Sequence, residues 1–301
     1  MLLVFLTAQI PTGCSKRKCE EKPVFSGDRA FQLLLAQCDF GPRPPKSAAH
    51  DSLRDWLVAF LDTLADEVSL QHFAEVGYEG EIIPMANVIA RFHTDADYRI
   101  LLCAHWDTRP WADHDPDTTN RNKPIMGAND GASGVAVLLH IAELIHRCPP
   151  QIGVDIVLFD GEDYGKEGDL SRYLMGSRFF AQNAGKSQWR FAILLDMIGD
   201  ADLHIPKEQF SATSFAPVVV ETVWARAKKL NLTAFEDKMG KAVIDDHHPL
   251  ARIGIRAIDI IDFEYPYWHT LQDTPDKCSP SSLKQVGTLL VDLIYNPPVK
   301  L

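Results

Sequence analysis

The sequence predicts a single α/β domain with a central twisted sheet, mixed but mainly parallel, and helices on both of its faces. Short apolar runs that suit buried strands alternate with longer segments whose apolar residues recur at helical spacing. The run over 154–160 ends in a group of acidic residues, at the edge where open α/β sheets place their ligand sites. A chain of 301 residues, 46% hydrophobic and 24% charged, suits one large globular domain.

The first part of the chain predicts two helices and three strands. Residues 28–38 carry apolar side chains at helical spacing, and the Gly- and Pro-rich segment 41–45 ends that pattern. Residues 47–66 carry a longer apolar stripe of the same period. Apolar or alternating runs then predict strands over 68–73, 85–92 and 98–104.

The second part alternates helices and strands, which implies parallel pairing. It opens with a polar loop over 108–128, and a loop of that length inside a compact domain is uncommon and often functional. The predicted helices cover 133–147, 171–183, 216–230 and 280–295. The predicted strands cover 154–160, 191–198 and 257–261.

The N-terminus differs from the rest of the chain. Residues 1–10 are apolar but too short to span a bilayer, and their length suits the hydrophobic region of a signal peptide without its usual positive start. Thr12-Gly13-Cys14 resembles a lipoprotein cleavage box, with Pro11 in an unusual place. We expect 1–22 to be a signal peptide or lipoprotein leader with a linker, and 23–301 to be a single catalytic domain. Such a bacterial protein would be exported, either periplasmic or anchored to the membrane by lipid on Cys14.

Charge and cysteine usage exclude some classes of protein. The formal net charge of -11 argues against a general nucleic-acid binder, which needs a basic face for phosphates. The six cysteines lack the CxxC spacing of zinc fingers and thioredoxin-like proteins, and the sequence assigns no disulfide.

Three carboxylates, Asp160, Glu162 and Asp163, follow the strand over 154–160 within four residues. Carboxylates this close repel one another, and a divalent cation neutralises them well. The alternative is a solvated acidic turn. The adjacent pair Glu162-Asp163 also permits a division of roles, in which one carboxylate binds a metal while the other acts as acid or base.

Further polar residues stand at strand ends or in unusual loops. Individually, each has a plain structural alternative, such as a helix N-cap for Asp130. Asp196 lies inside an apolar run, where an unpaired buried carboxylate is costly. Their carboxylates and imidazoles are of the types that bind a catalytic zinc, which takes about three protein side chains. The set is His105, Asp107, Asp130, Asp196, Asp245, Asp246, His247, His248, Trp268 and His269.

These motifs resemble a known family. HWD at 105, GANDGASG at 127, DGED at 160, LLDMIGD at 194, DDHHP at 245 and WHT at 268 occur in the order of the zinc-dependent aminopeptidase clan. DDHHP followed by WHT is similar to the glutaminyl-peptide cyclotransferases (glutaminyl cyclases) of that clan, in their bacterial form. The resemblance covers roughly residues 28–296 and implies a zinc-aminopeptidase-like fold.

The resemblance also implies a metal site. One zinc ion would be held by Asp130, Asp163 and His269, with Asp163 standing where the family usually has Glu. His105 corresponds to a ligand of the second metal in two-zinc aminopeptidases, and Asp196 is also present. These two residues would either bind a second zinc ion or support the ligands of the first, so the number of zinc ions stays open.

The remaining implied roles concern catalysis. Glu162 would be the general acid/base and would contact the substrate, and Trp268 would form a wall of the substrate pocket. Asp196 and Asp245 would be catalytic through a supporting hydrogen-bond network.

The implied reaction is cyclisation of the N-terminal glutamine of peptides or proteins to pyroglutamate, with release of ammonia. A zinc aminopeptidase of the same fold is the alternative. A catalytically inactive binding module is a third reading, against which the intact Glu162 argues. We expect the loop over 108–126 to shape the pocket rim or else to bind a second ion such as calcium, and the loop over 164–172 to form a second rim.

Overall fold

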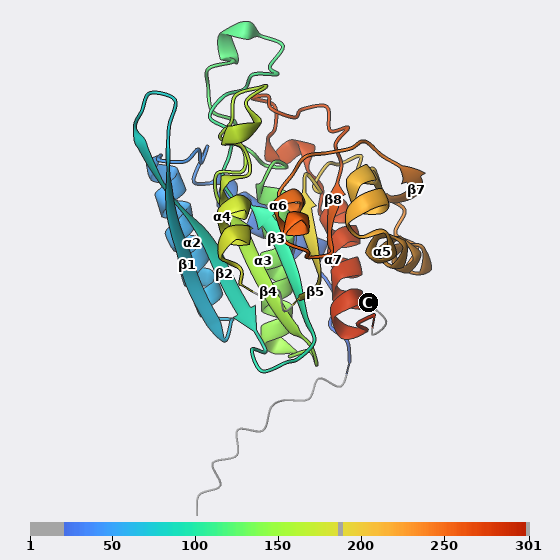
Figure 1. Cartoon of the computed structure of the whole chain (residues 1–301). Coiled ribbons are helices and arrows are strands. Elements are labelled where there is room, and N and C mark those ends of the chain that lie inside the picture. Colours follow the sequence, from blue (N-terminus) through green and yellow to red (C-terminus); the bar gives the residue numbers. More distant parts are fainter. Residues whose placement is uncertain (1–20, 186–188, 299–301) are drawn as a thin grey trace, which may run out of the picture.

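The computed structural model describes residues 21–185 and 189–298 (Figure 1). Nearly all of the leader expected at 1–22 therefore lies outside the described residues. Within the described ranges, no helix combines the length and the apolar character that a membrane-crossing segment needs.

A six-stranded mixed sheet forms the centre, with strand order β1-β2-β4-β3-β5-β8. β4, β3, β5 and β8 are parallel, while β2 runs antiparallel to both β4 and β1. Every residue of β3 and β4 is buried, which explains why their sequences are nearly continuous apolar runs. The strands are β1 Glu67–Val76, β2 Ile82–Phe92, β3 Arg99–His105, β4 Gly153–Phe159, β5 Trp189–Asp196 and β8 Ala257–Ile261.

Helices cover both faces of this sheet, so the predicted fold class is confirmed (Figure 1). One face packs against α1 Gly27–Cys38, α2 Ala48–Asp62, α3 Ala132–Arg147, α5 Pro217–Lys229 and α7 Pro280–Tyr295. The other face packs against α4 Met175–Asn183 and α6 His247–Arg252. Alternate residues of β3 and β4 contribute to the two cores, as the two-residue period of a strand requires.

Several predicted boundaries are wrong. The helix expected over 47–66 ends at Asp62, and β1 begins at Glu67 and continues to Val76 rather than stopping at 73. The helix expected over 171–183 begins only at Met175, after a 3-10 turn over Leu170–Arg172. The strand expected over 191–198 begins earlier, at Trp189, and ends at Asp196, because Met197 adopts the left-handed region with φ 46°.

Some short elements have no counterpart in the prediction. The exposed strand β7 Phe235–Met239 lacks an apolar pattern, and it pairs with β6 Ile205–Lys207 away from the main sheet. The helix α6 lies within the polar DDHHP segment. The remaining elements are the 3-10 helices η1 Thr118–Asn120 and η4 Pro275–Lys277 and the π-helix η3 Ser211–Phe215.

The strand order creates a topological switch beside β3. The chain leaves β3 through α3 and returns as β4 on one side, whereas β5 lies on the other side of β3. The carboxyl ends of the four parallel strands therefore meet at one edge, where such sheets open a crevice for ligands. The polar residues that follow β3, β4, β5 and β8 are brought together there.

Asp160 has a structural partner within the protein. Its Oδ1 lies 2.7 Å from Nε2 of His50 on α2, and its Oδ2 accepts the N–H of Ala86 at 2.7 Å. The His50 ring stacks on Trp106, with ring centroids 4.2 Å apart. Hence Asp160, expected to need a cation together with its neighbours, is compensated by His50, and it ties the end of β4 to α2 and β2.

We expect Asp160→Ala to lower the free energy of unfolding by about 3–5 kcal/mol, because His50 and the Ala86 N–H lose their buried partner. Chemical denaturation of the zinc-free protein measures this change. The control is Asp55→Ala, since Asp55 forms an exposed pair with Arg54, and such pairs contribute about 1 kcal/mol or less. Equal stability of both variants would contradict the role given to Asp160.

Candidate active site

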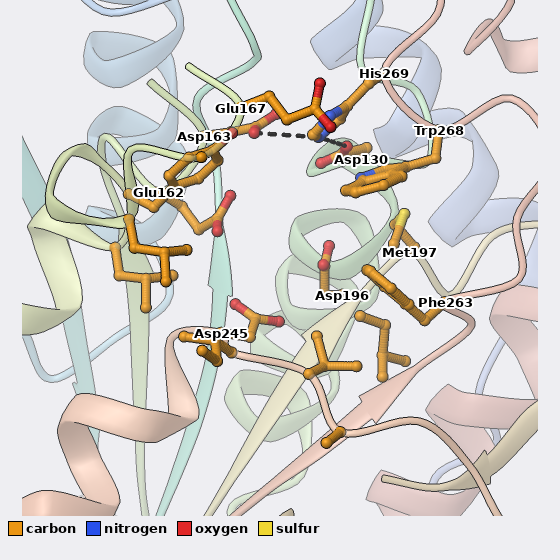
Figure 2. Close-up of a pocket in the computed structure, with 18 residues that line it drawn as sticks. Asp130, Glu162, Asp163, Glu167, Asp196, Met197, Asp245, Phe263, Trp268 and His269 are labelled. Atoms are coloured by element: carbon orange, nitrogen blue, oxygen red, sulfur yellow. Dashed lines mark ion pairs between the residues drawn. The ribbon is translucent and has the colours of Figure 1, made fainter. Parts of the chain in front are cut away.

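Three residues that the sequence predicts as zinc ligands meet at this edge (Figure 2). Asp130 precedes α3, Asp163 follows β4 and His269 follows β8. Nε2 of His269 lies 3.3 Å from Oδ1 of Asp163 and 3.7 Å from Oδ2 of Asp130. All three are buried, and one ligand atom from each lies within 4.8 Å of the others.

The chemistry of this group fits zinc. Oδ2 of Asp130 and Oδ2 of Asp163 are buried without a hydrogen-bond partner among the described residues, and an unpaired buried carboxylate oxygen is costly unless a cation compensates it. Two carboxylates and one imidazole form a familiar three-residue zinc set that leaves a position open. Burial and the nearby Asp163 raise the pKa of Asp130 to about 6, whereas His269 and Arg109 overcome burial and lower the pKa of Asp163 to about 2.

The backbone around Asp130 is fixed by Asp273. Its carboxylate accepts the N–H groups of Asn129 and Asp130 at 2.9 and 3.1 Å, and also the hydroxyl of Tyr265 at 2.8 Å. The next residue must be glycine, because a Cβ on Gly131 would lie 2.6 Å from the carbonyl oxygen of His105. This close approach explains the glycine of the GANDGASG motif, and the Asp130–Gly131 peptide bond is cis.

The turn after β4 is fixed by Asp107. Oδ1 of Asp107 accepts the N–H of Glu162 at 3.1 Å, and its Oδ2 accepts that of Asp163 at 3.3 Å. The turn also needs a left-handed residue, which Gly161 supplies with φ +67°. The DGED motif thus directs both acidic side chains toward the same pocket.

Glu162 faces the pocket across from the ligand group (Figure 2). Its side chain is only 13% exposed, and its Oε2 lies 4.0 Å from Nδ1 of His105. Burial and the charge of Asp163 raise the pKa of Glu162 well above its usual range. A carboxyl group that faces the pocket can exchange a proton with a bound substrate.

The residues expected for a second metal are also brought together. Nε2 of His105 lies 3.1 Å from Oδ1 of Asp130 and 3.2 Å from Oδ1 of Asp196. Asp107, Asp130 and Asp196 outweigh burial and raise the pKa of His105 well above its usual range. In this arrangement His105 balances the two carboxylates, and the same atoms would also serve a second ion.

Asp196 and Asp245, predicted to support the site through hydrogen bonds, both line the pocket with Glu162. Asp196 lies 3.2 Å from Nε2 of His105, and Asp245 accepts the N–H of Asp246. Their catalytic role stays a prediction. Behind Asp245 lies Asp259, a fully buried residue that the sequence analysis did not single out. Burial raises the pKa of both Asp245 and Asp259 well above the usual range.

The pocket has a volume of about 310 Å³. Trp268, predicted as a wall, lines it together with Phe263 and Tyr173, and the predicted rim at 164–172 contributes Glu167, Gly168 and Leu170. Three of its lining residues, Leu174, Met197 and His269, have φ of 58, 46 and 57°, a strained conformation that is frequent at functional sites.

The expectation for the loop over 108–126 needs correction. None of its residues lines the pocket. Two of its carboxylates bind backbone, since Asp115 accepts the N–H groups of Asp117 and Leu271, and Asp117 accepts that of Thr119. The loop instead packs against the segment that carries Trp268 and His269, through the hydrogen bonds that His114 and Asp115 form with it. The alternative of a second ion stays a prediction, since Asp113 and His114 lie with His269 in a group whose ligand atoms are within 4.8 Å of one another.

Sequence reasoning missed several residues that shape this site. Arg109, Asp113, Tyr173, Asp259 and Asp273 have no motif of their own. Only the closeness of Arg109 and Asp113 to HWD, and of Asp273 to WHT, offered a signal.

The sequence profile of peptidase family M28 matches residues 87–294. A glutaminyl cyclase of Bacteroides thetaiotaomicron, solved with N-acetylhistamine bound, is 38% identical with a TM-score of 0.87, over 92% of this chain and 99% of that chain. A leucine aminopeptidase precursor of Bacteroides thetaiotaomicron VPI-5482 is also 38% identical, with a TM-score of 0.88 over the same shares. Both solved structures therefore resemble this chain along almost their whole length.

The glutaminyl-peptide cyclotransferase of Bos taurus is 21% identical over 238 residues, which are 68% of this chain and 64% of that protein. The matches to the first curated relatives span between 37% and 64% of the length of those proteins. The chain belongs to peptidase family M28, and its structural neighbours include bacterial glutaminyl cyclases.

Proposed function

We propose that this protein is a zinc-dependent glutaminyl-peptide cyclotransferase that converts the N-terminal glutamine of peptides or proteins to pyroglutamate and ammonia. One observation carries the proposal. Glu162 lines one small pocket together with Asp130, Asp163 and His269, in a chain that aligns over 92% of its length with a solved glutaminyl cyclase. The coarser assignment, an enzyme of the zinc peptidase-like M28 family, rests on the family match itself.

Zinc held by Asp130, Asp163 and His269 would supply a Lewis acid for the γ-amide carbonyl of the substrate glutamine. The α-amine and the γ-amide belong to the same residue, so the pocket has only to hold the side chain bent back for the amine to attack. Trp268 and Phe263 provide apolar walls for the glutamine side chain. Glu162 takes the proton that the amine loses and delivers it to the departing ammonia.

The aminopeptidase remains the second candidate, because a specific observation favours it. His105, Asp130 and Asp196 form a second buried group whose ligand atoms lie within 4.8 Å of one another. Two-metal sites of this kind commonly hydrolyse peptide bonds through a metal-activated water. Glu162 would then serve as the base for that water.

We also propose export of the protein, either to the periplasm or as a lipid-anchored form, from the sequence of residues 1–22 alone.

A paired assay on purified, zinc-loaded protein separates the two reactions. We expect a peptide that begins with glutamine to release ammonia and to lose the mass of one ammonia molecule, as read by mass spectrometry. A peptide that begins with leucine should remain intact. Free leucine without ammonia from the first peptide would reject the cyclase in favour of the aminopeptidase.

We expect Glu162→Gln to reduce turnover by about 10²–10⁴-fold, because the amide cannot carry the proton from amine to leaving group. Its zinc content should equal that of the wild type. The matched control is Glu221→Gln, in which a side chain that is 71% exposed on α5 changes in the same way. Full activity of Glu162→Gln would remove this residue from the mechanism.

We expect His269→Ala to lose zinc together with activity, because the ligand group keeps only two carboxylates. Metal analysis after dialysis measures the zinc content. His204→Ala provides a comparison, since His204 is 54% exposed and far from these ligands in the sequence. Wild-type zinc content in His269→Ala would mean that the ligand assignment is wrong.

A further inference from the structure

Arg109 is a fully buried cation beside the candidate zinc site. Its Nη1 donates to Oδ1 of Asp163 at 2.9 Å and to the Asp163 carbonyl oxygen at 3.2 Å. Its Nε and Nη2 donate to the two carboxylate oxygens of Asp113 at 2.8 and 2.5 Å. The guanidinium therefore binds the carboxylate of Asp113 in a bidentate manner and the carboxylate of Asp163 through its remaining nitrogen, Nη1.

Asp113 in turn faces His269. Its Oδ1 lies 3.6 Å from Nδ1 of His269, and within residues 21–185 and 189–298 this buried nitrogen has no hydrogen-bond partner. The other ring nitrogen, Nε2, faces Asp130 and Asp163. A carboxylate beside Nδ1 favours the tautomer with the proton on Nδ1, which leaves the Nε2 lone pair free for a metal.

The backbone of His269 is held by the same loop. The N–H of His114 donates to the His269 carbonyl oxygen at 3.2 Å, and Asp115 accepts the N–H of Leu271 at 3.0 Å. His269 has φ 57°, a conformation that a histidine maintains only when its surroundings hold it. The loop thus reaches His269 through both its side chain and its backbone.

These contacts form a closed ring: Arg109 to Asp163, Asp163 to His269, His269 to Asp113, and Asp113 back to Arg109. We propose that Arg109 and Asp113 are positioning residues for zinc, which fix two of its three ligands, Asp163 and His269, in a single unit. This inference rests on the zinc site of the proposed function, but not on which reaction that site catalyses.

The ring explains why an arginine occupies position 109. A lysine has a single ammonium group and cannot bind both carboxylates with fixed geometry, whereas the flat guanidinium presents five N–H donors in a rigid arrangement. The ring also gives a reason for the short aspartate at 163. Arg109 binds both the side chain and the carbonyl oxygen of Asp163, and a short side chain keeps these two acceptors close to one guanidinium edge.

A purely structural role for Arg109 and Asp113 makes a different prediction. The pair would then stabilise the loop, and its loss would lower the unfolding temperature while the folded protein kept its zinc affinity. Zinc affinity is therefore the measurement that separates positioning from simple loop stabilisation.

The experiment measures the zinc dissociation constant by competition with a chromophoric chelator, without substrate, for Asp113→Asn, Arg109→Lys and the double variant. We expect about 10–100-fold weaker binding in each single variant, the usual cost of losing a residue that orients a ligand. The double variant should bind zinc no more than a few-fold more weakly than either single variant, because both changes break one unit. With cobalt in place of zinc, the visible absorption band should shift, since the ligand geometry relaxes.

Arg121→Lys is the matched control, because Arg121 lies in the same loop and donates its Nε to the Asp115 carbonyl oxygen outside the ring. Thermal unfolding of the zinc-free proteins shows which variants fold. If Arg109→Lys does not fold, the zinc affinity of the isosteric variant Asp113→Asn tests the proposal. Zinc affinity within twofold of the wild type and an unchanged cobalt spectrum in Asp113→Asn would overturn the proposal, as would a wild type that binds no zinc. A wild type that binds zinc but does not cyclise glutamine would reject the proposed reaction alone.

Discussion

Negative charge buried at the carboxyl edge of the parallel strands is the constraint on which this structure depends. Ionised carboxylates in a protein interior are costly unless each one has a partner. Several receive one from a distant element: Asp160 from His50 on α2, and Asp163 from Arg109. Others bind backbone N–H groups, as Asp107 and Asp273 do. The oxygens that remain without a partner are concentrated on the proposed zinc ligands and on the acids behind them.

The buried carboxylates therefore have two different roles: some fix the backbone, and others form the site. Asp107, Asp160 and Asp273 use their carboxylates to fix backbone at the sheet edge, and the functional side chains project from that fixed backbone. Asp163 does both, since Arg109 binds one of its oxygens while the other has no partner in the part of the chain that the structure describes. Because the compensating groups come from α2, the 108–126 loop and the segment after β8, the site forms only once the whole domain has folded.

The sequence was informative where chemistry and local pattern coincide. The buried strands are apolar runs, and the proposed ligands Asp130, Asp163 and His269 lie in short motifs just after or between them, so the strands could be predicted and these three residues could be singled out. Arg109 and Asp113 could not, because an arginine and an aspartate in a polar loop look the same whether they are solvated or buried against a distant histidine. The helix expected to reach 66 was overextended for a related reason. Its apolar spacing continues through Leu64, but the backbone turns at Thr63 to enter β1.

The same zinc-binding residues suit both a cyclase and an aminopeptidase. The two reactions differ in the source of the nucleophile and in the proton transfer that it requires. A peptidase must generate a nucleophile from water, and a second metal at His105, Asp130 and Asp196 would help it to do so. A cyclase receives its nucleophile from the substrate and needs only a group that carries one proton across the pocket. In this structure Nε2 of His105 lies 3.1 Å from Asp130 and 3.2 Å from Asp196, so the carboxylates of the second group already have a partner within the protein. Glu162 meanwhile faces the pocket, where it can carry that proton, and for this reason we favour cyclisation.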